Sequence, residues 1–388
     1  MEIYDKRQTR PVMISFAKSL AATYEIPFPA VTICSETKAS KKKFDFSKLS
    51  TQNLTLEEKI KLNALRQVCD LSEFKNDDKP IEGIKDVISQ LEQLSPQMMF
   101  NRCSYGSQKL FDCKKLFYKV VTDEGICFTF NMLDEKDLFN NGAIDNSIKL
   151  PQHGQKSDWF LDKDYESLKL KVYPNRVVGS GIQSGLAFEL KIKKSELNPG
   201  CKRGIQGFRL QLHTPVELPH MSKQFYSIPL QKETTIAVRP HSIYSSKDVQ
   251  EYDPMSRQCF FNHEKSLKFF NVYSKSSCAL ECLSNFTFAS CGCVKFSIPR
   301  DNVTKVCDNR GLECVHDTEV KFSTQHLEKK LLKKQLKKDL KQGKISKNSD
   351  EFKKLEQSER CNCLPSCTSL RYDAEISQTD FMVDRDEE

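Results

Sequence analysis

The sequence predicts an α+β protein: a mostly antiparallel β platform with helical insertions, followed by a cysteine-rich helical subdomain. Three observations support this class. Strand-like runs separated by Gly and Pro recur at 26–34, 116–131 and 165–240. Two segments between residues 54 and 94 have the apolar period of an amphipathic helix. Ten of the 16 cysteines lie between residues 259 and 367.

The elements follow in chain order. A strand is predicted in IPFPAVTIC (26–34), where β-branched residues alternate after two prolines. A helix is predicted over 54–69, with Thr55 as its N-cap and Glu58 at the capping-box position. A second helix is predicted over 81–94. Two strands flank the turn DEG within 116–131, and later strands are predicted in GLAFELKI (185–192), GFRLQLHT (207–214) and TTIAVRP (234–240).

The cysteine content points to an oxidising compartment. Sixteen cysteines in 388 residues are unusual for a cytosolic protein unless it binds metal. Three N-x-S/T sequons, at Asn53, Asn285 and Asn302, agree with export and predict glycosylation. No stretch approaches the ~20 apolar residues of a membrane span, and the first residues are not a signal peptide. We therefore expect a membrane anchor beyond one or both ends of this chain.

The ten cysteines from Cys259 to Cys367 allow 945 sets of pairs, and geometry reduces the number that fit. Cys278 and Cys282 are four residues apart in a predicted helix, so they share one face. Cys361 and Cys363 share one face if CNC is extended. If two disulfides join this helix to an extended segment that returns along it, the disulfides are nested in the sequence: 278–363 and 282–361, with 259–367 outside them. Two more disulfides, 291–314 and 293–307, could be nested inside these.

The sequence fits a disulfide-bonded extracellular protein better than a zinc-binding protein, an enzyme or a nucleic-acid-binding protein. CGC and CNC are tighter than the C-x₂₋₄-C pairs of zinc sites, so we predict no metal and no cofactor. No GxSxG, HExxH or phosphate loop is present, so no enzyme is predicted. Residues 329–341 hold seven Lys and one Asp, a local charge of +6 out of +8 overall. The segment from Leu327 to Leu340, which overlaps this basic run, is interpreted as a solvent-exposed helix with one apolar stripe. We favour this over a site that binds lipid, a partner helix or nucleic acid.

Two histidines lie seven residues apart in a segment that also contains two prolines. His213 and His220 flank TPVELP, and together they form a candidate pH or metal sensor. Ordinary strand or surface histidines are the interpretation that we favour, because histidines of this kind are common in any chain of this size.

Six blocks resemble the degenerin/epithelial sodium channel family, and most closely its arthropod pickpocket branch. They keep the family's order and span nearly the whole chain. The blocks are IPFPAVTIC (26–34), GICFTFN (125–131), GFRLQLHTPVELP (207–219), RQCFFNHEKSLKFFNVYSKSSCALEC (257–282), CGCVKFSIPR (291–300) and CNCLPSCTSLRYDAEIS (361–377).

The resemblance implies an ectodomain shaped like a hand. Residues 1–34 would enter the palm after a first transmembrane helix. Residues 35–258 would form palm, helical finger, β-ball and knuckle, and 259–367 a thumb with a five-rung disulfide ladder. Residues 368–388 would return through the palm to a second transmembrane helix. The resemblance also implies the pairs Cys34–Cys127 and Cys103–Cys113; Cys69 and Cys201 are then paired by elimination.

The implied function is that of a channel subunit. Family members form trimers, here homomeric or heteromeric, in the plasma membrane, and they pass sodium ions through a pore that amiloride blocks. This chain would be the extracellular part, which couples a ligand or mechanical force to a pore outside it. Ser256 stands where acid-sensing relatives have a Trp, which weakens the case for proton gating. The alternative is a soluble, truncated ectodomain that acts as a binding or decoy protein.

Overall fold

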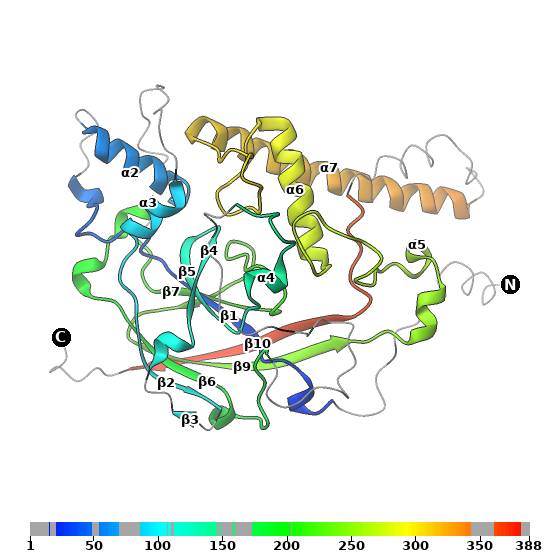
Figure 1. The fold of residues 1–388 in the computed structure, drawn as a ribbon, viewed down its shortest axis with the longest axis horizontal. Helices are drawn as coiled ribbons and strands as arrows, with labels where there is room; N and C mark the ends of the chain where they lie inside the picture. The colour runs from blue at the N-terminus through cyan, green and yellow to red at the C-terminus, as the bar shows by residue number, and fades with distance from the viewer. Residues whose placement is uncertain are drawn as a thin grey trace.

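The computed structural model describes most of the chain, namely residues 15, 21–48, 54–69, 86–106, 108, 109, 112–145, 148, 157, 159, 173–202, 204–342 and 361–381. In these residues, sheets occupy the lower part of the molecule as drawn, and helices lie above them (Figure 1). Every pairing between the named strands is antiparallel. The predicted α+β class is confirmed.

The largest sheet has five strands in the order β4-β5-β1-β7-β8. Its strands are β4 (Tyr118–Thr122), β5 (Gly125–Phe130), β1 (Ala30–Ser35), β7 (Phe208–His213) and β8 (Tyr226–Ile228). All six residues of β1 are buried, because β5 and β7 pair with its two edges and both faces are covered. A run rich in β-branched and apolar residues suits such a central strand.

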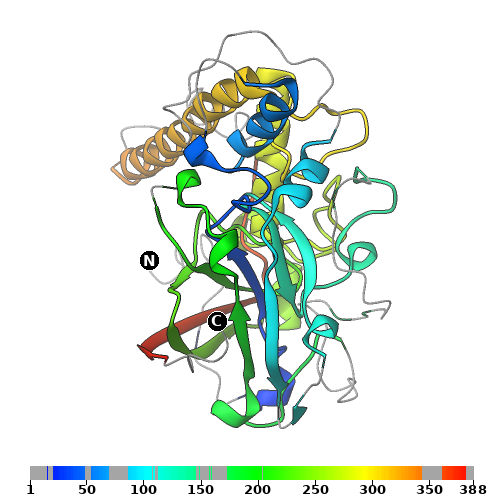
Figure 2. The ribbon, with the colours of Figure 1, turned by 90° about the vertical axis from the view of Figure 1, so that its left-hand side faces the viewer.

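A two-stranded ribbon is formed by β9 (Lys232–Ile243) and β10 (Ser369–Asp380), which are 12 residues long each. Their register runs without interruption from the pair Ser369 and Ile243 to the pair Asp380 and Lys232. The ribbon runs through the lower half of the molecule as drawn, where β10 is red and β9 is green (Figures 1 and 2). Leu370 and Tyr372, near the start of β10, are buried, and the other residues of the ribbon are exposed or half-buried.

A third sheet has the order β3-β2-β6, from β2 (Met99–Tyr105), β3 (Gln108–Lys109) and β6 (Leu186–Lys191). An aromatic cluster packs it against the large sheet. Phe100 stacks on Phe117, with ring centroids 4.3 Å apart, and lies edge-on to Phe128 at 5.2 Å. The main hydrophobic core lies on the other side of the large sheet, toward the helices.

Two short helices lie beside the large sheet. The first, α2 (Leu56–Arg66), begins with the predicted capping box: Thr55 accepts from the Glu58 amide, and the Glu58 carboxylate accepts from the Thr55 amide. The second, α3 (Val87–Leu94), packs on α2 and on β5 and buries Val87, Ile88, Leu91 and Leu94.

The other α-helices of the described residues are α4 (Glu135–Leu138), α5 (Pro254–Arg257), α6 (Lys275–Cys291) and α7 (Asn309–Lys341). The long helix α7 crosses α6 at the top of the molecule (Figure 1). Phe286 on α6 contacts Phe322 on α7, with ring centroids 5.3 Å apart. In the part of the chain that is described, no helix combines the length and the apolar character of a membrane span.

Candidate functional site

The cysteines are joined in eight disulfides, and no free cysteine remains. Three lie between residues 34 and 201, and five lie between residues 259 and 367. The pairs are Cys34–Cys127, Cys69–Cys201, Cys103–Cys113, Cys259–Cys367, Cys278–Cys363, Cys282–Cys361, Cys291–Cys314 and Cys293–Cys307.

Helix α6 carries two rungs of a disulfide ladder on one face. Cys278 bonds to Cys363 and Cys282 to Cys361, with Cα atoms 5.7 and 6.0 Å apart. Because i and i+4 project from the same side of a helix, both rungs reach the same short segment, residues 361–363, ahead of β10. The end of α6 is bonded to α7 through Cys291 and Cys314. The two helices and the returning segment therefore form one covalently closed unit.

Hydrogen bonds fasten the base of this unit. The Phe260 amide donates to the Pro365 carbonyl at 3.0 Å, and the Cys367 amide donates to the Phe260 carbonyl at 2.9 Å. The Tyr273 hydroxyl donates to the Leu364 carbonyl at 2.6 Å. The Cys259–Cys367 disulfide closes the same end. The segment that leads into β10 is thus held at its last residues before the strand begins.

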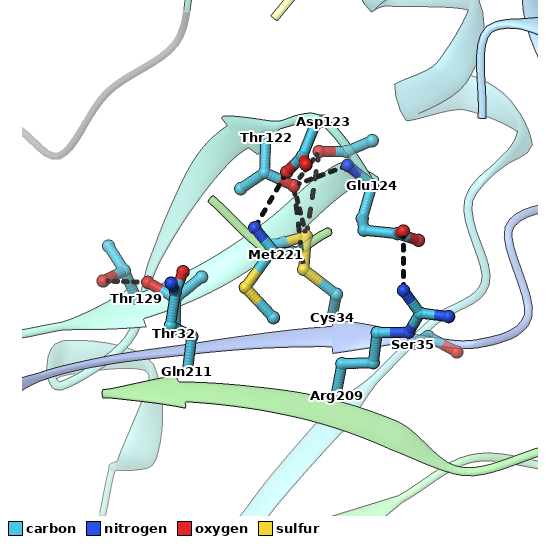
Figure 3. The surroundings of a disulfide bond; sticks show 12 residues. Thr32, Cys34, Ser35, Thr122, Asp123, Glu124, Thr129, Arg209, Gln211 and Met221 are labelled. Atoms are coloured by element: carbon cyan, nitrogen blue, oxygen red, sulfur yellow. Dashed lines mark hydrogen bonds and ion pairs between the residues drawn. A yellow bond between two sulfur atoms is a disulfide. The ribbon is translucent and has the colours of Figure 1, made fainter. Parts of the chain in front are cut away.

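The Cys34–Cys127 disulfide joins β1 to β5 in the middle of the large sheet (Figure 3). Both cysteines are fully buried. The Thr122 hydroxyl oxygen lies 3.1 Å from the sulfur of Cys127 and 3.7 Å from that of Cys34. The disulfide therefore joins two neighbouring strands close to the turn between β4 and β5.

A buried ion cluster lies beside this disulfide, and the glutamate of the turn is its centre. Glu124 forms ion pairs with Lys38 at 2.6 Å, with Arg209 at 2.8 Å and with Lys202. Arg209 also binds Glu36 at 2.6 Å. Three cations and two anions give the cluster a net charge of +1. Because Lys202 follows Cys201, the cluster links the Cys34–Cys127 disulfide to the Cys69–Cys201 disulfide.

Burial and charge act against each other in this cluster. Burial lowers the pKa of Lys38 to about 8, although Glu124 opposes the shift. Burial alone would raise the pKa of Glu124, but the ammonium groups of Lys38 and Lys202 outweigh it and hold that pKa below its usual value. The carboxylate therefore stays ionised and keeps its three partners. No spacing pattern in the sequence connects residues 36, 38, 124, 202 and 209, so sequence reasoning missed this cluster.

The two histidines that flank TPVELP lie in separate surroundings. His213 is buried at the end of β7, with Nε2 2.8 Å from the Thr32 hydroxyl and Nδ1 3.0 Å from the Thr214 carbonyl. Burial lowers its pKa to about 4. His220 is half-buried, with Nδ1 3.8 Å from the carboxylate of Asp123. Each imidazole therefore has its own partners. In the described part of the chain, no group of three or more His, Cys, Asp or Glu could hold a metal ion.

The basic run lies in the second half of α7. Leu327, Leu331 and Leu332 are about half exposed, and Leu336 is buried. Lys334 and Lys338 are exposed. Among the sequons, Asn285 is exposed on α6 and Asn302 is exposed in the loop that follows, while Asn53 lies outside the described residues.

Known proteins with similar sequences all point to one family. The family described as "Amiloride-sensitive sodium channel" matches residues 1–387. "Pickpocket protein 28" of Drosophila melanogaster is 26% identical over 396 residues, which cover 98% of this chain and 58% of that protein. "Sodium channel protein Nach" of the same species is 24% identical over 225 residues, covering 58% of this chain and 39% of that protein.

These relatives are longer than the chain, which spans 58% of the length of Pickpocket protein 28. The family consists of ion channels rather than enzymes. Because the match runs through both the sheets and the cysteine-rich helices, it covers the whole described fold. The chain belongs to the amiloride-sensitive sodium channel family.

Proposed function

We propose that this chain is the extracellular domain of a sodium-conducting channel subunit in the plasma membrane. The observation that carries the proposal is the family match over residues 1–387. The eight disulfides support it, because such a framework persists in an oxidising compartment outside the cytosol. The subunit would assemble with two copies of itself or with related subunits, and amiloride would block the pore that they form.

In this proposal the cysteine-rich unit from 259 to 367 acts as the thumb, and α2 and α3 belong to the finger. The strands β1, β9 and β10 belong to the palm. The eight disulfides of the structure are the native pairs, including Cys69–Cys201. In the same proposal Asn285 and Asn302, whose side chains are exposed and so accessible to a glycosylating enzyme, carry glycans.

The thumb would act on the palm through the segment that leads into β10. Three of its residues, Cys361, Cys363 and Cys367, are bonded to the thumb. The strand starts two residues later, at Ser369. Because only one residue separates Cys367 from β10, a displacement of α6 would be transmitted to the strand almost unchanged. A ligand or a force that moves the thumb would therefore move β10.

A contact at the start of β10 supports the same coupling. The Thr214 hydroxyl donates to the Leu370 carbonyl at 3.2 Å, and it also lies 3.3 Å from the carboxylate of Glu217. Thr214 directly follows β7, so this hydrogen bond connects the large sheet to the beginning of β10. Movement of β10 would thus be transmitted to the sheet that contains β1.

The test is current recording from oocytes that express the full-length subunit, alone and with related subunits. We expect an inward sodium current that amiloride blocks. The matched variant replaces both Cys278 and Cys363 with Ser, which removes one tie without leaving a free thiol. It should reach the surface, as measured by biotinylation, but respond less to the stimulus that opens the parent channel. A full-length subunit at the cell surface that conducts in no combination would favour a binding or decoy role.

A further inference from the structure

Residues 24–28, the entry segment, lead into β1 but belong to none of the named strands. Buried backbone groups outside a strand ladder need other hydrogen-bond partners. Four carbonyl groups of the entry segment accept from side chains that lie more than 100 residues away in the sequence: Arg176 for Tyr24 and Glu25 (3.1 Å each), Tyr372 for Pro27 (2.8 Å) and Asn131 for Phe28 (2.6 Å). The position of the entry segment therefore depends on a few side chains from three other parts of the chain.

Asn131 makes the most connections of these three side chains. It directly follows β5, and only 1% of the residue is exposed. Its Nδ2 donates to the carbonyls of Phe28 and Asn175, at 2.6 and 3.3 Å, and its Oδ1 accepts from the Asn175 amide at 2.6 Å. The Phe28 amide donates to the same Asn175 carbonyl at 2.9 Å. One buried amide thus joins the end of β5, the entry segment and the segment around residue 175.

The backbone of Asn131 adds a second requirement at this position. Its φ is +61°, in the left-handed region that most residues with a side chain avoid, and asparagine is among the few that adopt it readily. Glycine would meet the backbone requirement but has no amide group. Aspartate would tolerate the backbone as well, but its carboxylate cannot donate to the two carbonyls. Asparagine meets both requirements.

We propose that Asn131 is a positioning residue, which fixes the entry segment to the end of β5 so that this segment and the large sheet move together. The inference rests on the proposed channel function, in which the entry segment would connect β1 to a first transmembrane helix. A movement of the thumb that reaches the large sheet through β10 would leave the domain by this segment. Without the bonds of Asn131, the sheet could move while the entry segment stays behind.

The first test measures hydrogen exchange of single amides in the secreted chain with its disulfides intact. Asn131→Gly keeps a residue that adopts the left-handed conformation and removes the amide side chain. The Phe28 amide is the informative one, because its acceptor is the Asn175 carbonyl and not Asn131 itself. We expect it to exchange at least about tenfold faster in the variant, while the amides of β1 change by less than about threefold. Asn131→Asp, which loses only the donors, should act in the same direction.

The second test is a double-mutant cycle of Asn131→Gly with Tyr372→Phe, in urea unfolding of the same chain. The two side chains hold neighbouring carbonyls, those of Pro27 and Phe28. Once one bond is lost the other fixes the segment less well, so the two effects on the unfolding equilibrium constant should not multiply. The double variant should be at least about threefold more stable than their product predicts. Asn141→Gly, at an exposed position in the loop after α4, should instead multiply with Tyr372→Phe.

Three results would overturn the proposal. One is a Phe28 amide that exchanges as in the parent. Another is an equal acceleration of the β1 amides, because Asn131 would then contribute general stability only. The third is a double variant whose stability equals the product of the two single effects. Neither measurement needs a current, so these failures are distinct from failure of the proposed channel function, which would leave a full-length subunit at the cell surface without conductance.

Discussion

The phenol oxygen of Tyr372 donates a hydrogen bond to the carbonyl of Pro27 at 2.8 Å, across 345 residues of sequence. Tyr372 is buried near the start of β10, and Pro27 lies three residues before β1. This bond therefore joins the last strand of the described chain to the segment that leads into its first strand. A movement that separates these two segments would therefore stretch or break this bond.

Replacement of Tyr372 by Phe removes this bond and leaves the ring in place. A single buried hydrogen bond contributes about 1 kcal/mol, and the Pro27 carbonyl would be left without this donor. We expect the free energy of unfolding to fall by about 1–2 kcal/mol in urea titrations of the secreted chain. In the full-length channel the same variant should change the stimulus strength for half-maximal current.

Tyr252→Phe is the control, since Tyr252 is exposed in the turn just before α5 and its hydroxyl group has no hydrogen-bond partner among the described residues. It should change the free energy of unfolding by less than about 0.5 kcal/mol. Equal stability of Tyr372→Phe and the parent would show that the bond does not hold the two segments together.

Local signals in the sequence predicted much of the fold. The capping box at Thr55 and the hairpin around DEG are both confirmed, because each depends on residues that are neighbours in the chain. The helix with Cys278 and Cys282 is also confirmed, and it continues to Cys291, where Gly292 adopts a left-handed conformation that ends it.

Features that depend on distant partners were not predicted. β2 was missed because its sequence, MFNRCSY, has no clear alternation; Phe100 and Tyr105 are held there by aromatic contacts with Phe128 and Phe130 of β5. The ion cluster around Glu124 was missed because its five members come from four separate segments.

Removal of the charge at the centre of the ion cluster should be strongly destabilising. Glu124→Gln leaves Lys38, Lys202 and Arg209 without their shared carboxylate, and breaking one side of a buried ion pair typically costs about 3–5 kcal/mol. Thermal unfolding of the secreted chain measures this. The matched control Glu251→Gln removes an exposed charge and should leave the midpoint nearly unchanged. Similar midpoints for both variants would mean that the cluster adds no stability.

Loss of a rung of the ladder should harm the protein more than loss of a charge on α7. Cys282→Ser breaks the bond to Cys361 and leaves that residue as a thiol able to attack neighbouring disulfides. Loss of a native disulfide costs about 2–5 kcal/mol. Lys334 is exposed in a run of like charges, so Lys334→Ala should change stability by less than about 0.5 kcal/mol.

Secretion yield and melting temperature of the two variants give the comparison. A Cys282→Ser protein that folds and is secreted like the parent would show that this rung is dispensable. Failure of Lys334→Ala would instead indicate that the basic half of α7 binds something, against our interpretation of it as a solvated helix.

Acid should destabilise the chain through His213. The Thr214 carbonyl can only accept, so Nδ1 carries the proton of the neutral ring and Nε2 accepts from the Thr32 hydroxyl. Burial lowers the pKa of His213 from 6.5 to about 4. Above pH 6.5 the ring is neutral in both states and has no effect. Between 6.5 and about 4 only the unfolded state takes up the proton, so the free energy of unfolding falls as pH falls, by roughly 3 kcal/mol in all.

The measurement is urea unfolding at a series of pH values for the parent and for His213→Gln. Glu217 acts in the opposite direction, because burial raises its pKa, but it is present in both proteins and cancels in the difference. The variant should therefore lose less stability than the parent between pH 6.5 and 4. His241→Gln, which alters an exposed histidine of β9, should keep the parent's acid response. If His213→Gln kept that response too, another group would have to account for the acid sensitivity.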